Sequence, residues 1–367
     1  MKNQKTLLIF SPTIEDGGVE KNLFNISNFF SKKIANIFLI TANTDKKKKF
    51  NERIKFLSPN NYFWIHKSRF LKTLVCIFLF INFFINNKKN ITIFSFNSNL
   101  YAIIIGILFN CKVIIRSNTS PLSYSNNIIK KIIFRYVLRF ADKIIVNSVV
   151  FKNQMKNEFN LNSKCIYNPL ENINIINKKA NEKINFNFFR KKYLNIISVG
   201  RLVKQKDQLT LLKAMELLKN DIKYKLLIIG DGEEENNLKN YIKINFLKNI
   251  KIISYKKNPY PYIKKSDLFI LSSVNEGLPN ALIEAMALKK FIISSDCLTG
   301  PREILLNETY GFLFKIKNYK QLSIKIKKFY KYKNSLKTKS LLGFKSLERF
   351  NYNNKCNEYF NTIIKYL

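Results

Sequence analysis

The strongest constraint on the fold is an alternation of short apolar runs with longer segments of helical periodicity, repeated in both halves of the chain. Continuous runs of Val, Ile, Leu and Phe that end at turn residues are typical of strands buried on both faces of a parallel sheet. The segments between them then form right-handed crossovers. We therefore predict two doubly wound α/β domains. The runs are KTLLIF (5–10), ANIFLIT (35–41), ITIFSF (91–96), CKVIIR (111–116), DKIIVNS (142–148), LNIISVG (194–200), YKLLIIG (224–230), NIKIISY (249–255), SDLFILS (266–272) and KKFIISS (289–295).

Length and local composition indicate where the domains meet. The 367 residues are enough for two domains, each with its own core. The segment 167–193 opens with Asn168-Pro169, lacks clear periodicity and is rich in Asn and Lys, so we interpret it as a linker. We place the first domain at 1–170 and the second at 190–346.

Charge and cysteine content bound the partners and the compartment. The formal net charge is +40, which favours an anionic partner such as nucleic acid or a membrane surface. A compositional bias that spreads Lys over the whole chain is an alternative that stays open. The five cysteines are scattered and form no C-x-x-C pair, so they predict neither a disulfide framework nor a zinc site. We expect a reducing, cytoplasmic environment.

No segment of the sequence meets the length expected of a membrane-spanning helix. The apolar run 74–85 is interrupted by Asn82 and falls short of the roughly 20 residues that a bilayer requires. The first apolar run, 7–10, is shorter than the core of a signal peptide. We therefore predict no transmembrane helix and no signal peptide.

Glycine is scarce in this chain, so its positions are informative. Only ten glycines occur, and most of them follow a predicted strand or lie in a turn. The carboxyl ends of parallel strands are where open α/β sheets bind ligands. Loops also use glycine for purely structural reasons, and each position alone is a weak signal. The glycines in such places are Gly17, Gly18, Gly200, Gly230, Gly232, Gly277, Gly300 and Gly311.

Charged residues accompany these loops in the second half of the chain. Arg201 and Lys206 follow a predicted strand and precede a helix, where two cations can hold a diphosphate, although a basic solvated loop is also possible. Glu276 and Glu284 are eight positions apart, on either side of a Gly-Leu-Pro-Asn turn. The chain has no G-x-G-x-x-G and no Walker sequence, which disfavours NAD binding and ATP-dependent phosphoryl transfer.

Five segments together resemble glycosyltransferase family 4, and the resemblance covers nearly the whole chain. It implies the GT-B fold, with two Rossmann-like domains that face each other across a cleft and a C-terminal helix, here 347–367, that returns to the first domain. It also implies an acceptor-binding first domain, a donor-binding second domain, retention of anomeric configuration and no metal or other cofactor. The segments are GGVE (17–20), SVGRLVKQKD (198–207), IIGDGEEENNL (228–238), SSVNEGLPNALIEAMA (272–287) and GPREIL (300–305).

The same resemblance implies roles for individual residues. Glu276 would contact hydroxyls of the donor sugar, and Glu284 would accept hydrogen bonds from the nucleotide ribose. Arg201 and Lys206 would bind the diphosphate and stabilise negative charge on the leaving UDP. The candidate catalytic residues are Arg201, Lys206 and Glu276, and the candidate donor-binding residues are Gly17, Gly18, Gly200, Gly232, Gly277, Leu278, Pro279, Asn280 and Glu284.

The sequence departs from the family pattern in one loop of the first domain. Many family members carry a histidine there, but the equivalent loop reads IIRSNTSPLSYS (114–125). Arg116, Ser117 and Asn118 occupy that place, which leaves the contact to sugar or acceptor open. The single histidine, His66, is predicted to be a surface residue rather than a catalyst.

We expect a glycosyltransferase that moves a hexose or an N-acetylhexosamine from a UDP-sugar to a lipid-linked or polysaccharide acceptor in bacterial surface glycan biosynthesis. The segment 130–143, with Lys131, Arg135 and Arg139 on one helical stripe, and the apolar segment 68–84 favour contact with an anionic membrane surface. An ordinary helix that covers a sheet fits the same pattern. We expect a cytoplasmic protein, peripheral on the inner face of the cytoplasmic membrane.

Two other functions compete with this interpretation. A UDP-N-acetylglucosamine 2-epimerase would share the fold and the nucleotide site, but its acid and base groups are harder to supply in a chain with a single histidine. A nucleic-acid-binding protein would explain the positive charge. However, no recognisable DNA or RNA module is present and the aromatic residues lie in apolar runs, so we expect no nucleic-acid partner.

Overall fold

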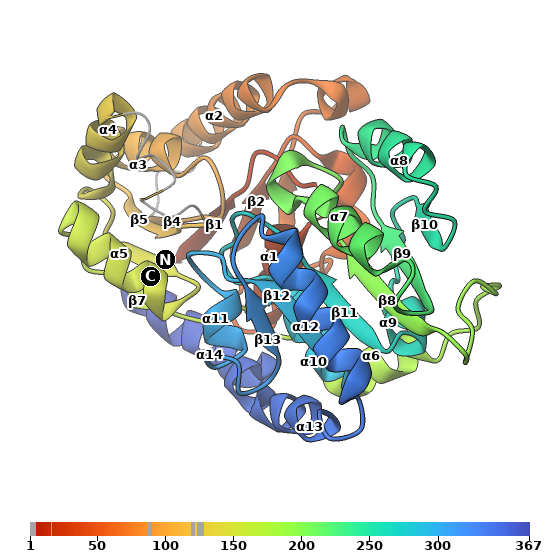
Figure 1. Cartoon of the computed structure of the whole chain (residues 1–367). Coiled ribbons are helices and arrows are strands. Elements are labelled where there is room, and N and C mark those ends of the chain that lie inside the picture. Colours follow the sequence, from red (N-terminus) through yellow and green to blue (C-terminus); the bar gives the residue numbers. More distant parts are fainter. Residues whose placement is uncertain (1–4, 16, 87–89, 119–121, 123–127) are drawn as a thin grey trace. The chain divides into compact units, whose positions relative to one another are not determined.

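The chain folds into two compact units, each built on one parallel sheet with helices on both faces (Figure 1). The first unit comprises Met1–Pro169 and Tyr352–Leu367, and the second comprises Leu170–Asn351. This confirms the predicted fold class of two doubly wound parallel-sheet units. The residues that the computed structural model describes are 5–15, 17–86, 90–118, 122 and 128–367.

The first unit contains a sheet with the strand order β3-β2-β1-β4-β5-β6-β7. Its strands are β1 (Thr6–Phe10), β2 (Ile37–Ile40), β3 (Lys55–Leu57), β4 (Ile91–Ser95), β5 (Lys112–Arg116), β6 (Lys143–Val146) and β7 (Lys164–Cys165). Leu8 of β1 lies opposite Phe38 on one side and Ile93 on the other, and both pairings are parallel. All residues of β1 and β4 are buried, as expected for strands covered on both faces.

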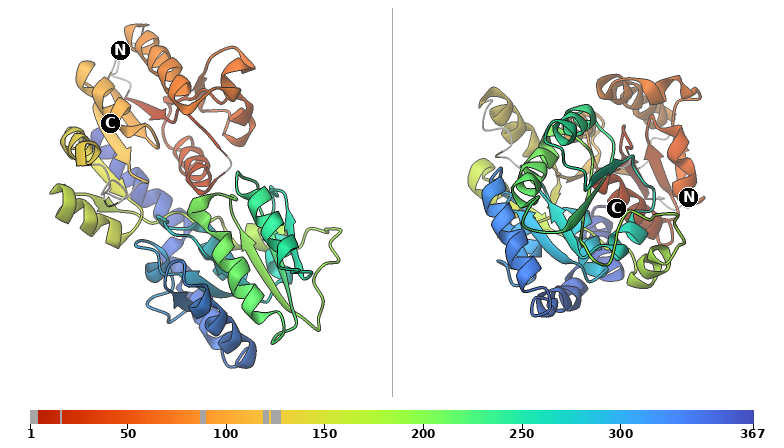
Figure 2. Two further views of the ribbon diagram at one scale, coloured as in Figure 1. Left: turned by 45° about the horizontal axis from the view of Figure 1, so that its top comes forward. Right: turned by 45° about the vertical axis from the view of Figure 1, so that its right-hand side comes forward.

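Helices cover the two faces of this first sheet (Figure 2). They are α1 (Gly18–Phe30), α2 (Arg69–Asn86), α3 (Asn99–Leu108), α4 (Ile128–Leu138), α5 (Val149–Phe159) and α14 (Tyr352–Ile363), with the short 3-10 helices η1 (Thr44–Lys49), η2 (Tyr62–His66) and η6 (Ile364–Tyr366). Phe80 of α2, Ile103 of α3, Leu138 of α4 and Met155 of α5 pack in one buried cluster, so these four helices share a face. Helices α1 and α14 pack in the cluster on the other face.

The second unit contains a sheet with the strand order β10-β9-β8-β11-β12-β13. Its strands are β8 (Leu194–Val199), β9 (Tyr224–Ile229), β10 (Ile250–Ile253), β11 (Leu268–Leu271), β12 (Phe291–Ser295) and β13 (Phe312–Phe314). Its helices are α6 (Ile173–Ala180), α7 (Gln208–Leu218), α8 (Glu235–Ile244), α9 (Tyr260–Lys265), α10 (Asn280–Ala287), α11 (Pro301–Ile304), α12 (Tyr319–Lys331) and α13 (Lys337–Lys345), with η4 (Lys204–Lys206) and η5 (Ser346–Phe350). Residues of α7, α8 and α12 pack on the sheet in one buried cluster.

Each of the ten apolar runs predicted to be strands forms a strand of the expected sheet. The edge strands β3 and β13 and the two-residue strand β7 were not predicted. The segment 167–193, which we interpreted as a linker without clear periodicity, contains the eight-residue helix α6, which packs against α9 and α10. Its buried residues Ile176 and Ala180 are spaced as on one helix face.

Helix α14 belongs to the first unit although it ends the chain. Cys356, Tyr359 and Ile363 are buried against the face that α1 also covers. The hydroxyl of Thr92 in β4 donates a hydrogen bond of 2.7 Å to the main-chain oxygen of Tyr366. The last segment therefore completes the core of the unit in which the chain began.

One described helix, α2, is apolar and long enough to cross a membrane by length and composition alone. The sequence argument considered only the run 74–85, whereas the helix spans 18 residues. One row of the helix, which includes Cys76 and Phe80, is buried in the cluster on the first sheet. Helix α2 is therefore part of the layered first unit.

Candidate functional site

The strand order of the second sheet reverses between β8 and β11, which are neighbours although β9 and β10 intervene in sequence. In doubly wound sheets the loops at the carboxyl ends separate at such a point and leave a crevice for ligands. Arg201 and Lys206 lie in the loop after β8, and Glu276 lies in the loop after β11. The structure therefore brings the three candidate catalytic residues to one sheet edge.

Main-chain and side-chain hydrogen bonds join the loops after β8 and β11. The hydroxyl of Ser272 donates to the main-chain oxygen of Lys206 at 2.9 Å, and the N–H of Val274 donates to the oxygen of Gln205 at 2.9 Å. The side-chain amide of Gln205 donates to the oxygen of Asn275 at 2.7 Å. Because of these bonds the two loops hold a fixed relative position.

The two loops place Lys206 and Glu276 in direct contact as an ion pair. The Lys206 side chain is 20% exposed and that of Glu276 is 9% exposed, so the pair is largely shielded from water. The Ser273 hydroxyl donates a second hydrogen bond, of 2.6 Å, to Oε1 of Glu276. Two residues 70 positions apart in sequence thus form an ion pair at the strand-order reversal.

Two hydrogen bonds join the loop after β12 to the loop that carries Glu276. The hydroxyl of Thr299 donates to the main-chain oxygen of Glu276, and the thiol of Cys297 donates to the oxygen of Ser273 at 2.9 Å. Burial raises the pKa of Cys297 to about 12, so the thiol keeps its proton at neutral pH. Gly300 has φ +87°, and a Cβ there would overlap the main-chain oxygen of Gly277.

Sequence reasoning did not identify Thr299 or Cys297 as supporting residues. The segment GPREIL at 300–305 was part of the family resemblance, and it marks the loop to which they belong. A hydroxyl and a thiol are common in any sequence, so their type alone carries no signal. Only the adjacency of β11 and β12 shows which loop they support.

The loops after β8 and β9 are also joined, and glycine permits their close approach. The N–H of Leu202 donates to the oxygen of Asp231 at 2.8 Å, and that of Glu234 donates to the oxygen of Leu202 at 2.9 Å. A Cβ on Gly230 or Gly232 would overlap the main chain of the β8 loop. The structure therefore gives these two glycines a packing role.

The neighbouring candidates Gly200 and Arg201 differ from them. A Cβ on Gly200 would make only ordinary contacts, at 3.8 Å, with the stem of Lys206. Arg201 is exposed, and its main-chain oxygen accepts a hydrogen bond of 2.9 Å from the Gln208 side chain. Main-chain bonds therefore fix the loop while the side chain of Arg201 extends to the surface.

Glu284 lies inside α10 and is buried, unlike the loop residue Glu276. Its carboxylate accepts a hydrogen bond from the hydroxyl of Tyr260, the first residue of α9. Burial, followed by the charges of Glu284 and Glu171, raises the pKa of Tyr260, so the phenol stays protonated and acts as a donor. Sequence reasoning missed Tyr260, because nothing in the local pattern distinguishes it from other buried aromatic residues.

The turn between the two glutamates contains the remaining candidates of the second unit. Leu278 is buried and anchors the turn, and Pro279 precedes the first helical residue, Asn280. Pro279 has extended backbone angles and makes no side-chain cap. The first N–H groups of α10 therefore lie directly beside Gly277 and Glu276 in sequence.

Gly17 and Gly18 lie in the first unit, at the start of α1. Gly17 precedes the helix with an extended backbone, and its oxygen accepts the first helical hydrogen bond, from the N–H of Lys21 at 3.2 Å. A Cβ on Gly17 would meet the carboxylate of Glu20 at 2.7 Å. The loop after β1 thus leads directly into a thirteen-residue helix, as predicted.

Arg116, one of the three residues in the place of the family histidine, is fully buried. Its Nε donates to the hydroxyl of Tyr359 at 3.1 Å, one terminal nitrogen donates to Asn168 at 2.6 Å, and the other donates to Asn118. Its guanidinium also lies 5.7 Å from the ring centre of Phe96. Arg116 therefore anchors helix α14.

The other residues of the loop 114–125 and the single histidine have their own surroundings. Ser117 is also buried, and part of the loop 114–125 lies outside the described residues. His66 is exposed at the end of η2, which confirms that it is a surface residue.

Residues 179–354 match the family "Glycosyl transferases group 1". The match covers just under half of the chain and lies mainly in the second unit. The matched region includes Lys206, Glu276, Glu284 and the turn between the two glutamates, whereas Gly17 and Gly18 lie outside it. The comparison names the broader group and does not distinguish family 4 within it.

Sequence relatives of the chain include named glycosyltransferases. It is 28% identical to the amylovoran biosynthesis glycosyltransferase AmsD of Erwinia amylovora, over 83% of this chain and 85% of that protein. It is 32% identical to the N-acetylgalactosamine-N,N'-diacetylbacillosaminyl-diphospho-undecaprenol 4-alpha-N-acetylgalactosaminyltransferase of Campylobacter jejuni, over 53% of this chain and 52% of that enzyme. The chain thus aligns with about half of the length of the first curated relatives.

Solved structures show that the fold of the chain is GT-B. HepE of Anabaena, crystallised with UDP and glucose, matches with a TM-score of 0.79 over 98% of this chain and 99% of that one. The sequence identity is 16%, so the likeness concerns the fold alone. The predicted GT-B fold of two parallel-sheet α/β domains is thereby confirmed.

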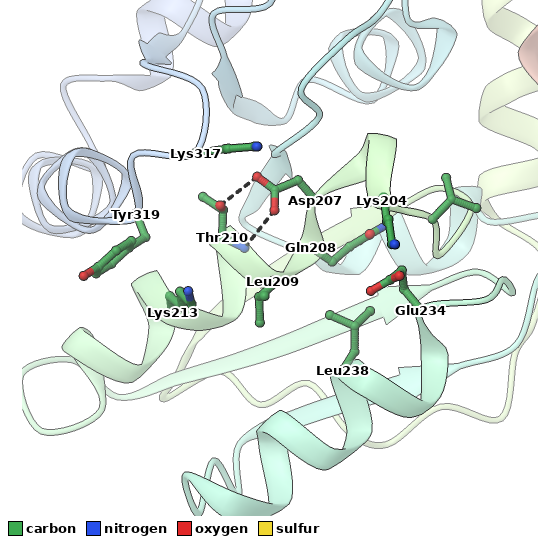
Figure 3. Close-up of a pocket in the computed structure, with 11 residues that line it drawn as sticks. Lys204, Asp207, Gln208, Leu209, Thr210, Lys213, Glu234, Leu238, Lys317 and Tyr319 are labelled. Carbon is green, nitrogen blue, oxygen red and sulfur yellow. Dashed lines mark hydrogen bonds between the residues drawn. The ribbon is translucent and has the colours of Figure 1, made fainter.

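Two cavities are found in the described residues, and neither is lined by Lys206 or Glu276. One, of about 400 Å³, is lined by residues of α7, α8 and the 317–319 segment, including Lys204 (Figure 3). Asp207 at its edge accepts hydrogen bonds from Thr210, at 2.7 Å from the hydroxyl, and so caps α7. None of the candidate site residues lines this cavity.

The other cavity, of about 250 Å³, belongs to the first unit and has a polar rim and an apolar wall. Asn97 and Asn118 contribute to the rim, and Phe134 and Phe159 contribute to the wall. The Asn97 amide nitrogen donates to the oxygen of Thr13 at 2.8 Å, so the loops after β1 and β4 are joined. This edge is the strand-order reversal of the first sheet, where β1 and β4 are neighbours.

Proposed function

We propose that the chain is a family 4 glycosyltransferase that moves a hexose or an N-acetylhexosamine from a UDP-sugar to a lipid-linked or polysaccharide acceptor. The observation that carries this proposal is the Lys206–Glu276 pair at the strand-order reversal of a group 1 glycosyl transferase domain. An ammonium group suits a diphosphate, and an adjacent carboxylate suits sugar hydroxyls. The proposal thus assigns Lys206 to the diphosphate of the donor and Glu276 to its sugar.

In the proposed reaction the bond between the anomeric carbon and the diphosphate oxygen breaks, and its electron pair leaves with UDP. The acceptor hydroxyl oxygen forms the new bond to that carbon, and its proton passes to the released diphosphate. Lys206 and Arg201 would stabilise the negative charge that grows on the diphosphate. The proposal requires no metal or other cofactor, because these cations supply the positive charge.

Donor binding is assigned to the segment that follows β11. Glu284 would accept hydrogen bonds from the ribose hydroxyls, with Tyr260 holding its carboxylate. The main-chain N–H groups of the turn from Gly277 to Asn280 would approach the diphosphate. We also propose retention of anomeric configuration, as in family 4, without assigning a nucleophile to the enzyme.

The acceptor class and the location of the enzyme are also part of the proposal. The Campylobacter relative is named for an acceptor carried on diphospho-undecaprenol, and the Erwinia relative is named for amylovoran biosynthesis. Both names support a glycan acceptor, either lipid-linked or polymeric. A lipid-linked acceptor would place the enzyme at the inner face of the cytoplasmic membrane as a peripheral protein.

Release of UDP from a panel of UDP-sugars, with and without lipid extracts as acceptors, tests this function. We expect Lys206→Ala and Glu276→Ala each to lower turnover by about 100-fold, because each removes a charge that acts on the donor in the transition state. Lys204→Ala is the matched control, since Lys204 lies two positions away and lines a different cavity. That variant should keep its activity.

Circular dichroism should show that all three variants keep the wild-type fold. Equal turnover of wild type, Lys206→Ala and Glu276→Ala would remove the pair from the reaction. Turnover of a UDP-sugar to an isomeric UDP-sugar without any acceptor would identify an epimerase instead.

A further inference from the structure

We propose that α2, α3 and α4 of the first unit form a membrane-docking surface whose solvent-facing apolar rows insert shallowly into a bilayer that contains anionic lipid. This inference deepens the proposed function, since it rests on a lipid-linked acceptor and identifies the part of the chain that meets the lipid.

The three helices lie side by side on one face of the first sheet. Their inward residues belong to a single buried cluster. The hydroxyls of Thr73 in α2 and Ser98 at the start of α3 are 3.2 Å apart, and the rings of Phe84 and Phe109 are 4.5 Å apart. Helix α3 packs in turn against α4. The three helices are therefore neighbours on this face, and their outward sides point away from the sheet (Figure 1).

Helix α4 carries the most pronounced apolar row. Leu138 is its only buried residue among those that the structure describes, and Lys131 on the same side pairs with Glu158 of α5 at 2.6 Å. Ile128 is 72% exposed, and Ile132 and Tyr136 continue the row at intervals of four residues. The row consists of Ile128, Ile129, Ile132, Ile133, Tyr136 and the following Phe140.

This arrangement corrects the basic stripe predicted from the sequence. Lys131 was grouped with Arg135 and Arg139 on one outward stripe, but it is only partly exposed and forms an ion pair within the unit. Arg135 and Arg139 are exposed and lie one turn apart, along one edge of the apolar row. The outermost face of α4 is thus apolar, with arginines at its border.

Helices α2 and α3 extend the same surface. Phe78 of α2 is 69% exposed, and Phe70 and Leu74 lie on the same side of the helix, opposite the buried Phe80. Leu108 of α3 is 72% exposed. Isolated exposed apolar residues are ordinary, whereas a continuous apolar surface over three helices marks an interaction site.

The charges at this surface favour a lipid bilayer with anionic headgroups as the occupant. Helices α2 and α4 contain basic residues, α3 is uncharged, and none of the three contains an acidic residue within its described range. Apolar rows bordered by arginine are typical of helices that lie in a membrane interface, where the guanidinium reaches the lipid phosphates. A second copy of the chain would bring the same arginines together across a twofold axis, which is unfavourable.

The geometry also determines the depth of insertion. The row of α2 that includes Cys76, Phe80 and Phe83 is buried on the sheet, so this helix cannot cross the bilayer without unfolding the unit. Only the outward rows are available to lipid. We therefore expect the helices to lie along the interface, with their apolar side chains near the boundary of headgroups and acyl chains.

Flotation with phosphatidylcholine vesicles, with and without phosphatidylglycerol, tests the surface. We expect wild type to bind the anionic vesicles more strongly. Ile128→Gln with Ile132→Gln should abolish flotation, and Arg135→Gln with Arg139→Gln should lower the partition into anionic vesicles by roughly 10- to 30-fold. The matched control, Leu217→Gln with Ile244→Gln, changes exposed apolar residues of the second unit and should bind like wild type.

Fluorescence provides a second measurement that does not depend on loss of binding. The chain contains one tryptophan, Trp64, which packs at the edge of the first core. In a Trp64→Phe background, Phe78→Trp should be quenched by brominated lipids, whereas Ile244→Trp in the second unit should not. Equal quenching at the two positions would overturn the proposed orientation.

The outcomes separate this proposal from the proposed function. Release of UDP by the wild-type enzyme, together with failure to bind either kind of vesicle, would overturn the docking surface alone. Row variants that float like wild type, or row-dependent dimerisation in place of vesicle binding, would also overturn it. Absence of UDP release with every donor would instead count against the glycosyltransferase.

Discussion

Glu276 and Glu284 have different surroundings, although they belong to one loop and the helix that follows it. Glu276 contacts the ammonium of Lys206 and the hydroxyl of Ser273, both of which could be exchanged for ligand groups. Glu284 is buried and accepts a hydrogen bond from Tyr260. We infer that the first glutamate is held by a charge and the second by a neutral donor.

The Tyr260–Glu284 contact leads to a prediction about nucleotide binding. Tyr260→Phe removes the hydrogen bond that orients the Glu284 carboxylate, so we expect the affinity for UDP to fall by about 10- to 150-fold, which corresponds to the range for a hydrogen bond to a charged group. The affinity for 2′,3′-dideoxy-UDP should not change, because that ligand lacks the ribose hydroxyls assigned to Glu284. Isothermal titration calorimetry with both nucleotides measures the difference.

Tyr224→Phe is a suitable control for this measurement. Tyr224 is also a buried tyrosine of the second unit, and its hydroxyl donates to the main-chain oxygen of Met215 at 3.1 Å. Loss of the Tyr224 hydroxyl should lower the free energy of unfolding and leave the ratio of the affinities for the two nucleotides unchanged. If Tyr260→Phe weakened both ligands equally, its role would be structural.

The sequence predicted part of this site because acidic residues and glycines are both scarce in the chain. Lys206 and Glu276 were each singled out beside glycines that follow predicted strands, and the structure adds that they form a pair. Tyr260 and Thr299 could not be found in this way. Their importance depends on which loops and helices are neighbours, and a single sequence does not contain that information.

At the scale of elements, helix α14 shows how one buried cation joins distant segments. Arg116 at the end of β5 donates to Tyr359 in α14 and to Asn168 near the end of the first stretch of the unit. The hydroxyl of Tyr359 also donates to the oxygen of Ile166 at 3.3 Å. Three segments that are far apart in sequence therefore meet at one guanidinium.

Removal of one acceptor should reveal the cost of leaving that cation unsatisfied. We expect Tyr359→Phe to lower the free energy of unfolding by about 1.5–3 kcal/mol, the usual contribution of a hydrogen bond to a charged group. Urea denaturation followed by circular dichroism measures the change. Tyr352→Phe, which removes a partly exposed bond of 3.1 Å to the Asn25 oxygen, should have a smaller effect. Equal losses of unfolding free energy in the two variants would show that the charge of the buried Arg116 does not increase the cost of losing the hydrogen bond.

Length explains which strands were predicted from the sequence and which were not. The predicted strands have four to six residues in the structure, and all of them except the edge strand β10 are largely buried. The missed strands β3, β7 and β13 have only two or three residues, and β3 begins with the exposed Lys55. Such short segments become strands because a neighbouring edge offers hydrogen bonds, which is a tertiary effect.

At the scale of the whole molecule, the repeated alternation of strands and helices was sufficient to predict two parallel-sheet units. The first stretch of the first unit ends at Pro169, one residue before the predicted limit at 170, whereas the second unit begins at Leu170 and not at 190. Segment 167–193 is polar, but Ile176 and Ala180 are buried and α6 packs into the second unit. The composition of the segment therefore did not reveal helix α6, which buries only one apolar residue in each turn.

The buried cysteines lead to a prediction for the stability of the whole chain. Burial raises the pKa of Cys76, Cys297 and Cys356 to about 12, from an ordinary value of 9.0. The folded protein then holds these protons more tightly than the unfolded chain, so the stability that they contribute is complete below pH 9 and is lost between pH 9 and about 12. Each thiol should lower the free energy of unfolding by about 1.4 kcal/mol per pH unit at most.

One buried lysine acts in the opposite direction and determines how the measurement should be designed. Burial lowers the pKa of Lys290 to about 8 from 10.5, so its unfavourable contribution fades as the pH rises through this interval. Three thiols outweigh one amine, so urea midpoints should fall above pH 9. Cys76→Ala should flatten that fall while it lowers the midpoint at neutral pH, because it removes one titrating thiol and leaves a small cavity. A midpoint independent of pH above 9 would mean that the thiols ionise in the folded state as they do in the unfolded chain.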